Sequence, residues 1–299
     1  MAIIGYGFIG RRIAHVANTR GWRVTALTHE PNLRPADPAH DVVVGDACDA
    51  STLARVMQGV KHVVFAAGTV KPAESNLHPL DEVSANLRPL ISTLAAMRDS
   101  TATSMTFLSS AGTVYGPDAE VPTPEDAPLW PISSYGVLKV AAERYINLYA
   151  HQYDFAADIL RCANVYGPGE PTSGSQGLIG VTRGALLHDH PVVMFGDGST
   201  RRDFIHVDDV ALVVEELARV ADGVRVLNVG SGRSDSVAEV IDAVAHSLGK
   251  TPVFDHHPAR PTDVPLVQLD VTRLRSLIDF TPRELRSGLV DGDPAVETS

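Results

Sequence analysis

The sequence has 299 residues, of which 44% are apolar and 20% are charged, which suits a globular protein with one large core or two closely joined lobes. Its formal net charge of −11 argues against a nucleic acid as partner, because phosphate backbones are bound by basic surfaces. Cys48 and Cys162 are too few for a disulfide framework, and no apolar stretch approaches the roughly 18 residues that span a membrane. We therefore expect a reduced, cytoplasmic protein with no signal peptide and no membrane partner.

Short β-branched runs alternate with helical patterns through the first half of the chain. The predicted strands are Ala2–Ile4, Trp22–Leu27, Val42–Val44, His62–Ala66, Ser104–Leu108 and Phe155–Leu160, and the predicted helices are Ile9–Thr19, Ser51–Gln58, Leu80–Arg98 and Ser133–Tyr153. Apolar strands that alternate with helices predict a parallel sheet covered on both faces, with right-handed crossovers. The expected fold class is therefore α/β, a Rossmann-like doubly wound parallel sheet.

The sequence changes in character after Arg161. Its later elements are predicted as a Gly-, Pro- and Ser-rich loop at Asn164–Ser175, helices at Leu178–His188 and Val237–Leu248, and a strand at Val226–Val229. We expect a sheet domain over residues 1–163 and a smaller C-terminal lobe mainly over residues 164–299. The two are interleaved, because a strand near 224–229 returns to the main sheet. The polar, acidic tail at 291–299 is expected to be frayed.

A glycine-rich loop, Gly5-Tyr6-Gly7-Phe8-Ile9-Gly10, follows the first strand and opens the first helix. In that position glycines allow a tight turn and the close approach of a pyrophosphate to the helix N-terminus. The alternative is a tight turn that needs only small residues. The placement between strand and helix favours a dinucleotide cofactor.

The end of the second strand bears on which dinucleotide is bound. Glu30 could bind the adenosine ribose of NAD, whereas His29 or Arg34 could meet the 2′-phosphate of NADP. A solvated loop is the alternative for all of them. We expect NAD as cofactor, and the sequence leaves NADP open.

Tyr135 and Lys139 lie four residues apart in a predicted helix, and therefore on one helix face. There the ammonium group can lower the pKa of the phenol from its free value of about 10. Such a phenol is a suitable proton shuttle for an alcohol or sugar hydroxyl. A pair of exposed helix residues that meet by chance is the alternative.

The segment His206-Val207-Asp208-Asp209 contains the residue types of a metal site. We interpret Asp208 or Asp209 instead as the cap of a helix that begins at Val210. The other histidine pairs lie in polar loops without the spacing of one tetrahedral site. We expect no metal.

Together, these features resemble the extended short-chain dehydrogenase/reductases, in particular NAD-dependent nucleotide-sugar epimerases of the UDP-glucose 4-epimerase type. The resemblance runs from Gly5 to about Leu289. Besides the glycine loop and the Tyr135/Lys139 helix, its motifs are Gly45-Asp46-Ala47-Cys48-Asp49, Phe65-Ala66-Ala67-Gly68, Asn86, Ser109–Gly116, Leu160–Pro168, Arg202–Asp209, Asn228–Gly232 and Arg260–Pro265. The resemblance implies a dinucleotide-binding domain at 1–163 and a mainly substrate-binding lobe at 164–299.

The resemblance also implies the site residues. The cofactor-binding residues would be Gly5, Gly7, Phe8, Ile9, Gly10, His29, Asp46, Ala47, Ala66, Ala67, Gly68, Asn86, Tyr135 and Lys139. Tyr135 would take the proton from the sugar 4-hydroxyl, and Lys139 would hold the nicotinamide ribose and lower the tyrosine's pKa. Asp46 would contact adenine.

On the substrate side, the resemblance places Asn164 against the sugar and its diphosphate. Arg202 and Arg260 would bind the diphosphate, a role that suits the guanidinium fork. Asp263 would orient the nucleotide ribose or the neighbouring arginine. Surface salt bridges are the alternative for the two arginines.

The sequence departs from the family pattern at Ala111, which occupies the usual position of the catalytic Ser or Thr. A methyl group cannot donate a hydrogen bond to the reacting oxygen. Ser110, Thr113 or a water molecule could supply the hydroxyl, and we take Ser110 and Thr113 as the catalytic candidates.

The same loop bears on the reaction. The 4,6-dehydratases of this family carry an Asp-Glu pair where this sequence has Gly112 and Thr113, so a dehydratase is not expected. We expect a 4-epimerase that acts on a UDP-hexose. The alternatives are an NAD(P)-dependent 4-ketosugar reductase or dehydrogenase, and a non-catalytic dinucleotide-binding regulator. A homodimer is expected through the helices Leu80–Arg98 and Ser133–Tyr153.

Overall fold

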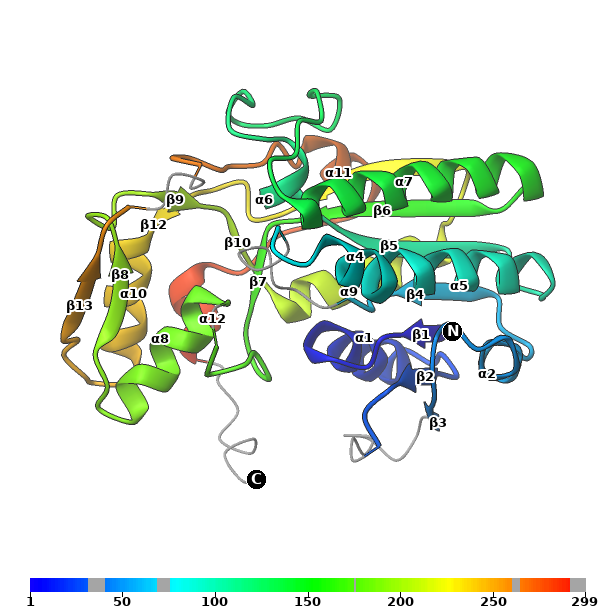
Figure 1. Cartoon of the computed structure of the whole chain (residues 1–299), viewed down its shortest axis with the longest axis horizontal. Coiled ribbons are helices and arrows are strands. Elements are labelled where there is room, and N and C mark those ends of the chain that lie inside the picture. Colours follow the sequence, from blue (N-terminus) through cyan, green and yellow to red (C-terminus); the bar gives the residue numbers. More distant parts are fainter. Residues whose placement is uncertain (32–40, 69–75, 175, 260–263, 291–299) are drawn as a thin grey trace.

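The computed structural model describes residues 1–31, 41–68, 76–174, 176–259 and 264–290. A seven-stranded sheet in the order β11-β6-β5-β4-β1-β2-β3 forms its centre, and all of its neighbouring strands run parallel (Figure 1). These strands are β1 (Ala2–Ile4), β2 (Thr25–Thr28), β3 (Asp41–Val44), β4 (His62–Phe65), β5 (Ser104–Ser110), β6 (Ala156–Cys162) and β11 (Val224–Val229). The predicted Rossmann-like α/β class is confirmed.

Helices cover both faces of the sheet, as expected for buried parallel strands. The core on one face is built with α1 (Phe8–Thr19), α9 (Val207–Arg219) and α11 (Thr272–Leu277), and the core on the other with α2 (Ala50–Val56), α5 (Arg88–Arg98) and α7 (Ser134–Tyr153). Successive side chains of a strand point to opposite faces. Accordingly, Ile3 packs into the first core and its neighbours Ala2 and Ile4 into the second.

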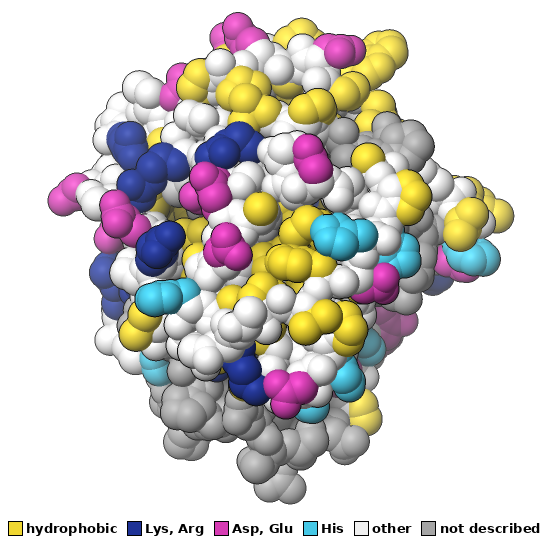
Figure 2. Space-filling view, turned by 90° about the vertical axis from the view of Figure 1, so that its left-hand side faces the viewer, with side chains coloured by type: hydrophobic (Ala, Val, Ile, Leu, Met, Phe, Trp, Pro, Cys, Tyr) yellow, Lys and Arg dark blue, Asp and Glu magenta, His cyan; other side chains and the backbone are white. Residues whose placement is uncertain are grey.

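A smaller lobe lies beside the sheet domain (Figure 1). It contains α8 (Leu178–Leu187), β8 (Val192–Phe195), α10 (Val237–Ser247), β13 (Phe254–His257) and α12 (Leu285–Val290), and all but β13 supply buried residues to its core. Two short ladders join it to the sheet domain: β7 (Asn164–Tyr166) with β10 (Phe204–His206), and β9 (Arg201–Arg202) with β12 (Asp235–Ser236). In Figure 2, which faces this end of the molecule, Lys and Arg side chains lie mostly on the left among acidic ones, and most histidines lie on the right.

The second strand begins later than predicted, at Thr25 rather than Trp22. The Trp22 amide donates to Ala17 O at 3.0 Å, so this residue completes the end of α1. Its indole Nε1 donates to Glu215 Oε1 of α9 at 2.8 Å. A partner 193 residues away therefore overrides the β propensity of Trp22.

The helix predicted over Leu80–Arg98 is interrupted. It consists of α4 (Pro79–Glu82), a π-helical segment η1 (Val83–Leu87) and then α5. Pro89, near the start of α5, has no N–H group and cannot continue an unbroken hydrogen-bond ladder. The wider π turn accommodates this break and contains Asn86.

The tail at 291–299, predicted to be frayed, lies outside the described residues. The division into two domains stays a prediction. Among the helices that the structure describes, none is both long enough and apolar enough to cross a bilayer.

Candidate active site

The glycine loop lies at the carboxyl end of β1, between β4 and β2, where the strand order reverses. In a doubly wound sheet this switch point is where ligands bind. A Cβ on Gly5 would overlap the backbone of Ala66 and Ala67, and a Cβ on Gly10 would overlap the carbonyl oxygen of Gly5. Gly5 also has a φ of 104°, which favours glycine.

The N-terminus of α1 fits a dinucleotide pyrophosphate. Its N-cap is Gly7, without a side-chain cap, and its first turn carries no acidic residue. No described atom lies within 4 Å of the position that a Cβ on Gly7 would take. Phe8 and Ile9 form the first turn, so their amides face this open side, where a negatively charged group is stabilised.

The loops after the neighbouring strands line the same edge of the sheet. Ala66, Ala67 and Gly68 follow β4, and the Ala66 amide donates to Ile4 O at 2.8 Å. After β2, His29 is exposed, and Arg34 lies outside the described residues. After β3, the exposed Asp46 accepts from the Cys48 amide at 2.8 Å, and Ala47 packs against the core.

Tyr135 and Lys139 lie in the first turns of α7, whose N-cap Ser133 accepts from the Gly136 amide. Lys139 Nζ donates to Leu108 O at 2.7 Å and lies 5.4 Å from the centre of the Tyr135 ring. The two side chains are therefore neighbours, and the lysine is also anchored to β5.

The electrostatics of this pair differ from the sequence expectation. Burial raises the pKa of Tyr135, and charge on Cys162 and Glu82 raises it further. Burial lowers the pKa of Lys139 to about 8. In this arrangement burial shifts the pKa of the phenol in the direction opposite to the expected one, because burial disfavours the charged phenolate.

A small cavity brings several of the predicted residues together. It is lined by Ala67 from the loop after β4, Asn86 from η1, and Tyr135 and Lys139 from α7, with apolar walls from Phe65, Phe107, Leu138 and Ala142. This is the carboxyl edge of β4 and β5. The cavity therefore brings Ala67 of the expected cofactor-lining segment next to Tyr135, the expected proton shuttle.

Ala111 is buried at the start of α6 (Ala111–Val114), a short turn directly after β5. Thr113 Oγ1 donates to Ser110 O at 3.3 Å, so this hydroxyl is used within the turn. Ser110 is the N-cap of α6, but its side chain does not cap the turn. Of the two candidates, Ser110 is the one whose hydroxyl the turn does not engage.

The structure brings two of the predicted substrate residues near each other. Asn164, exposed at the start of β7, donates through Nδ2 to Asp203 O at 3.1 Å, next to Arg202 in the chain. Arg202 donates through NH1 to Arg201 O and Val264 O, so its guanidinium is anchored at the edge of the lobe. Arg260 and Asp263 lie outside the described residues.

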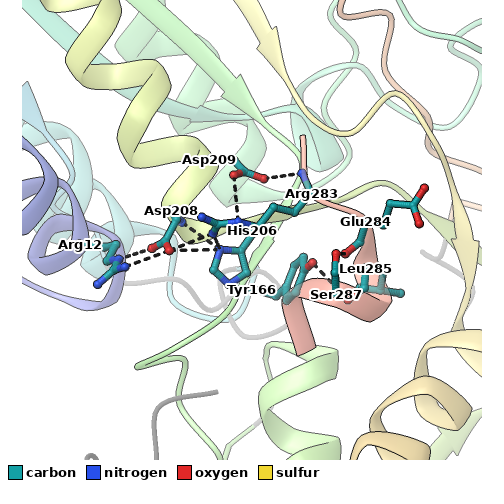
Figure 3. Close-up of polar contacts among 9 residues, drawn as sticks. All are labelled: Arg12, Tyr166, His206, Asp208, Asp209, Arg283, Glu284, Leu285 and Ser287. Atoms are coloured by element: carbon teal, nitrogen blue, oxygen red, sulfur yellow. Dashed lines mark hydrogen bonds and ion pairs between the residues drawn. The ribbon is translucent and has the colours of Figure 1, made fainter. Parts of the chain in front are cut away.

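A polar cluster behind the glycine loop was not expected from the sequence (Figure 3). Asp208 accepts from Arg12 of α1 and, at 2.9 Å, from Arg283 NH1 of the C-terminal segment. The α9 cap is His206, whose Nδ1 accepts from the Asp208 amide, so the predicted capping by Asp208 or Asp209 is wrong. Asp209 instead accepts from the Arg283 amide at 2.8 Å. The cluster ties α1 to α9 and to the segment that precedes α12 of the smaller lobe.

Among the residues that the structure describes, no three His, Cys, Asp or Glu side chains gather as a metal site would require.

Asp203, a fully buried carboxylate, accepts hydrogen bonds from the amides of Ser231, Gly232 and Leu269. Burial raises its pKa to about 6. It acts as a structural acceptor for the loop after β11.

The fold and this site define a dinucleotide-dependent enzyme with a Tyr–Lys pair at the carboxyl edge of its sheet. A family model places it more closely: residues 1–230 match the NAD dependent epimerase/dehydratase family, and the chain belongs to this family. The predicted family and the NAD-dependent class of enzyme, of the extended short-chain dehydrogenase/reductase type, are thereby confirmed. NAD is the cofactor that defines this family.

Individual proteins are similar over nearly the whole length. The UDP-glucose 4-epimerase of Mycolicibacterium smegmatis is 31% identical over 93% of this chain and 91% of its own. The Thermotoga maritima UDP-glucose 4-epimerase with UDP-glucose superimposes with a TM-score of 0.90 at 27% identity, covering 97% of both chains. The Thermus thermophilus UDP-glucose 4-epimerase in complex with NAD reaches 0.89 at 27% identity, covering 99% of this chain and 100% of that one.

Proposed function

We propose that this protein is a nucleotide-sugar 4-epimerase that acts on a UDP-hexose through transient oxidation at C4. The observation that carries the proposal is the cavity in which Ala67, Asn86, Tyr135 and Lys139 meet, in a chain similar to UDP-glucose 4-epimerases over nearly its whole length. Residues 1–163 would bind NAD and residues 164–299 mainly the substrate.

Tyr135 would take the proton from the sugar 4-hydroxyl, with the positive charge of bound NAD favouring its phenolate form, and would return the proton after the sugar has rotated in the site. Lys139 would hold the nicotinamide ribose from its anchor on Leu108 O. Bound NAD would supply the acceptor and donor of the hydride. Ser110 would donate the hydrogen bond that Ala111 cannot give to the reacting oxygen.

The nucleotide would be held more firmly than the sugar, since the sugar must rotate. Asn164 and Arg202, which lie together at the lobe edge, would contact the sugar diphosphate. Arg260 would complete the diphosphate site, and Asp263 would orient the nucleotide ribose or this arginine. An arginine guanidinium can donate two parallel hydrogen bonds to phosphate oxygens, so it would hold the diphosphate and leave the hexose able to rotate.

The proposal is tested by incubating the purified protein with UDP-sugars and separating the 4-epimers by chromatography. We expect interconversion without added cofactor, because tightly held NAD is regenerated in each cycle. An absence of interconversion across UDP-glucose, UDP-galactose, their N-acetylamino forms and the uronic acids would overturn the proposal. If a 4-keto sugar instead consumes NADPH stoichiometrically and the purified protein carries no NAD, the protein is a reductase.

We also propose that the protein is a homodimer through α4, η1 and α7, which pack side by side. The outer surface of these helices is apolar: Leu80 is 80% exposed and Val137 52%, and Leu77, Val83, Tyr145 and Leu148 are also exposed. Val137, Tyr145 and Leu148 lie on one face of α7, because their spacings of 8 and 3 residues match the helical period. A second copy, whose apolar face is identical, fits this surface.

Sedimentation velocity checks the dimer. We expect the wild type to sediment as a dimer at micromolar concentration and Val137→Asp/Leu148→Asp as a monomer, because two buried charges oppose association. Val253→Asp, an exposed apolar position on the smaller lobe, is the control and should remain dimeric. A monomeric wild type would refute the interface.

A further inference from the structure

Glu82 is a buried carboxylate beside the proposed active site that the family motifs do not single out. It is the last residue of α4 and only 8% exposed. A carboxylate loses hydration when it is buried and needs hydrogen-bond donors in exchange. One of its donors is Asn86, which lines the cavity with Tyr135.

The contacts of Asn86 fix the orientation of its amide. Nδ2 donates to Glu82 Oε2 at 2.9 Å and to the main-chain Glu82 O at 3.1 Å. Both partners are acceptors only, so the group that faces them must be the NH₂ and not the carbonyl oxygen. The Asn86 carbonyl oxygen is therefore turned away from Glu82.

The other side of Asn86 faces the segment after β4. A Cβ placed on Gly68 would lie 3.0 Å from Asn86 Oδ1. Ala67, the preceding residue, lines the same cavity as Asn86. The Asn86 carbonyl oxygen therefore lies at the carboxyl edge of the sheet, beside Gly68 and next to the loop whose backbone packs against Gly5.

The π turn makes this arrangement local. Glu82 ends α4, and Asn86 lies within η1, four residues later. The side-chain amide of Asn86 donates to the main-chain carbonyl of Glu82 across this π-helical turn. Single π turns of this kind are frequent at functional sites. The position of the Asn86 side chain and the π-helical turn therefore both involve the pair Glu82 and Asn86.

Glu82 also acts electrostatically on the proposed proton shuttle. The groups whose charges act on Tyr135 from the surrounding elements are Glu82 from α4 and Cys162 from β6, and Lys139 lies beside its ring on α7. After burial and Cys162, charge on Glu82 is the third cause that raises the pKa of Tyr135. Removing this charge should therefore lower that pKa.

We infer that Glu82 is a positioning residue of this site: its carboxylate holds Asn86 with the carbonyl oxygen toward the cleft, where it accepts a hydrogen bond from a hydroxyl or amide group of the bound dinucleotide. The inference rests on the proposed function in that the cleft binds NAD. It does not depend on which sugar is converted.

The test compares Glu82→Ala, Glu82→Gln and Asn86→Ala by the dissociation constant for NAD, measured calorimetrically after bound NAD has been removed. Glu82→Ala should weaken NAD binding about tenfold, because the Asn86 amide loses a charge-assisted partner and can turn. Glu82→Gln keeps an acceptor oxygen for Asn86 Nδ2 and should bind within about threefold of the wild type. Asp81→Asn removes an exposed charge from the same helix and serves as the control.

A double variant separates positioning from a general effect on folding. If Glu82 acts through Asn86, Glu82→Ala/Asn86→Ala should bind NAD no more weakly than Asn86→Ala alone. Additive losses, or a loss in Glu82→Gln as large as in Glu82→Ala, would overturn the inference. These binding data decide the matter even if no UDP-sugar is converted.

With an active enzyme, the pH profile gives a second readout. Glu82→Gln should move the acidic limb of the turnover profile to lower pH, because the phenolate of Tyr135 loses a like charge. Asp81→Asn should leave the limb in place. An unmoved limb in Glu82→Gln would show that this charge does not reach Tyr135.

Discussion

Tyr135→Phe is expected to lower the turnover of the nucleotide sugar by about 10²- to 10⁴-fold, the usual contribution of a positioned proton shuttle. The phenylalanine ring fills the same space, and the tyrosine ring is only 6% exposed, so its packing is retained. What is lost is the hydroxyl that takes and returns the proton of the sugar 4-hydroxyl. The NAD content of the purified protein should remain close to that of the wild type.

The control for this variant is Tyr149→Phe, the same substitution further along α7, where the ring packs against Tyr153. Its turnover should match that of the wild type. Initial rates at saturating substrate, with NAD released by denaturation and quantified, separate loss of chemistry from loss of cofactor. A Tyr135→Phe enzyme with wild-type turnover would remove Tyr135 from the proton transfer and leave the proposed epimerisation itself untouched.

Some parts of this site could be predicted because their signals are local. The glycine loop is specified by residues that are adjacent in the chain and lie between a strand and a helix. The pairing of Tyr135 and Lys139 follows from the helical period alone. Alternating apolar strands and helices likewise fix the class of the sheet, since both of its faces must be buried.

The electrostatic state of the same pair could not be predicted, because it depends on burial. Spacing places an ammonium beside a phenol, but it does not state how much water reaches either group. In the structure both groups lose hydration, which raises the pKa of Tyr135 and lowers that of Lys139. The adjacent Glu82 adds a charge that the sequence motifs did not single out.

Other errors arise from partners distant in the chain. Trp22 has the propensity of a strand residue, but its indole N–H donates a hydrogen bond to Glu215 of α9. The cap of α9 is His206, because Asp208 is engaged by Arg12 and Arg283 from opposite ends of the chain. These partners lie 193 and 196 residues from Trp22 and Arg12, respectively, in the chain, so local sequence patterns could not reveal the contacts.

Several residues of the family motifs turn out to hold the fold around the site. Tyr115 Oη donates to Asn228 Oδ1 at 2.6 Å, across 113 residues. Arg161 donates through NH1 to Tyr115 Oη at 3.1 Å and to Glu125 O at 2.9 Å. The motifs that contain Tyr115, Arg161 and Asn228 are far apart in the sequence but form one buried polar network in the structure.

The centre of this network is an ion pair between Arg161 of β6 and Glu143 of α7. Arg161 Nε and NH2 donate to the two carboxylate oxygens at 3.1 and 2.7 Å, and both side chains are at most 5% exposed. Ser109 Oγ donates to Glu143 Oε1 at 2.6 Å. Glu143 lies one helical turn after Lys139, so the ion pair also fixes the part of α7 that carries the active site.

Arg161→Met is therefore expected to lower the free energy of unfolding by about 3–5 kcal/mol, measured by urea denaturation of the NAD-free protein. The loss arises because Glu143 is left buried without its cation and Tyr115 without a donor. Arg233→Met is the matched control. Its guanidinium pairs with Glu284 on the surface, so the change should cost less than about 1 kcal/mol.

The double variant Glu143→Met/Arg161→Met separates the two contributions to this loss. It removes both charges and fills the space with apolar side chains, so it should be more stable than Arg161→Met alone. Its turnover should nevertheless stay below that of the wild type, since the first turns of α7 lose their fixed anchor on β6. An Arg161→Met protein as stable as Arg233→Met would contradict the assignment. It would mean that Glu143 reaches water or another donor, and that the position of Lys139 does not depend on this ion pair.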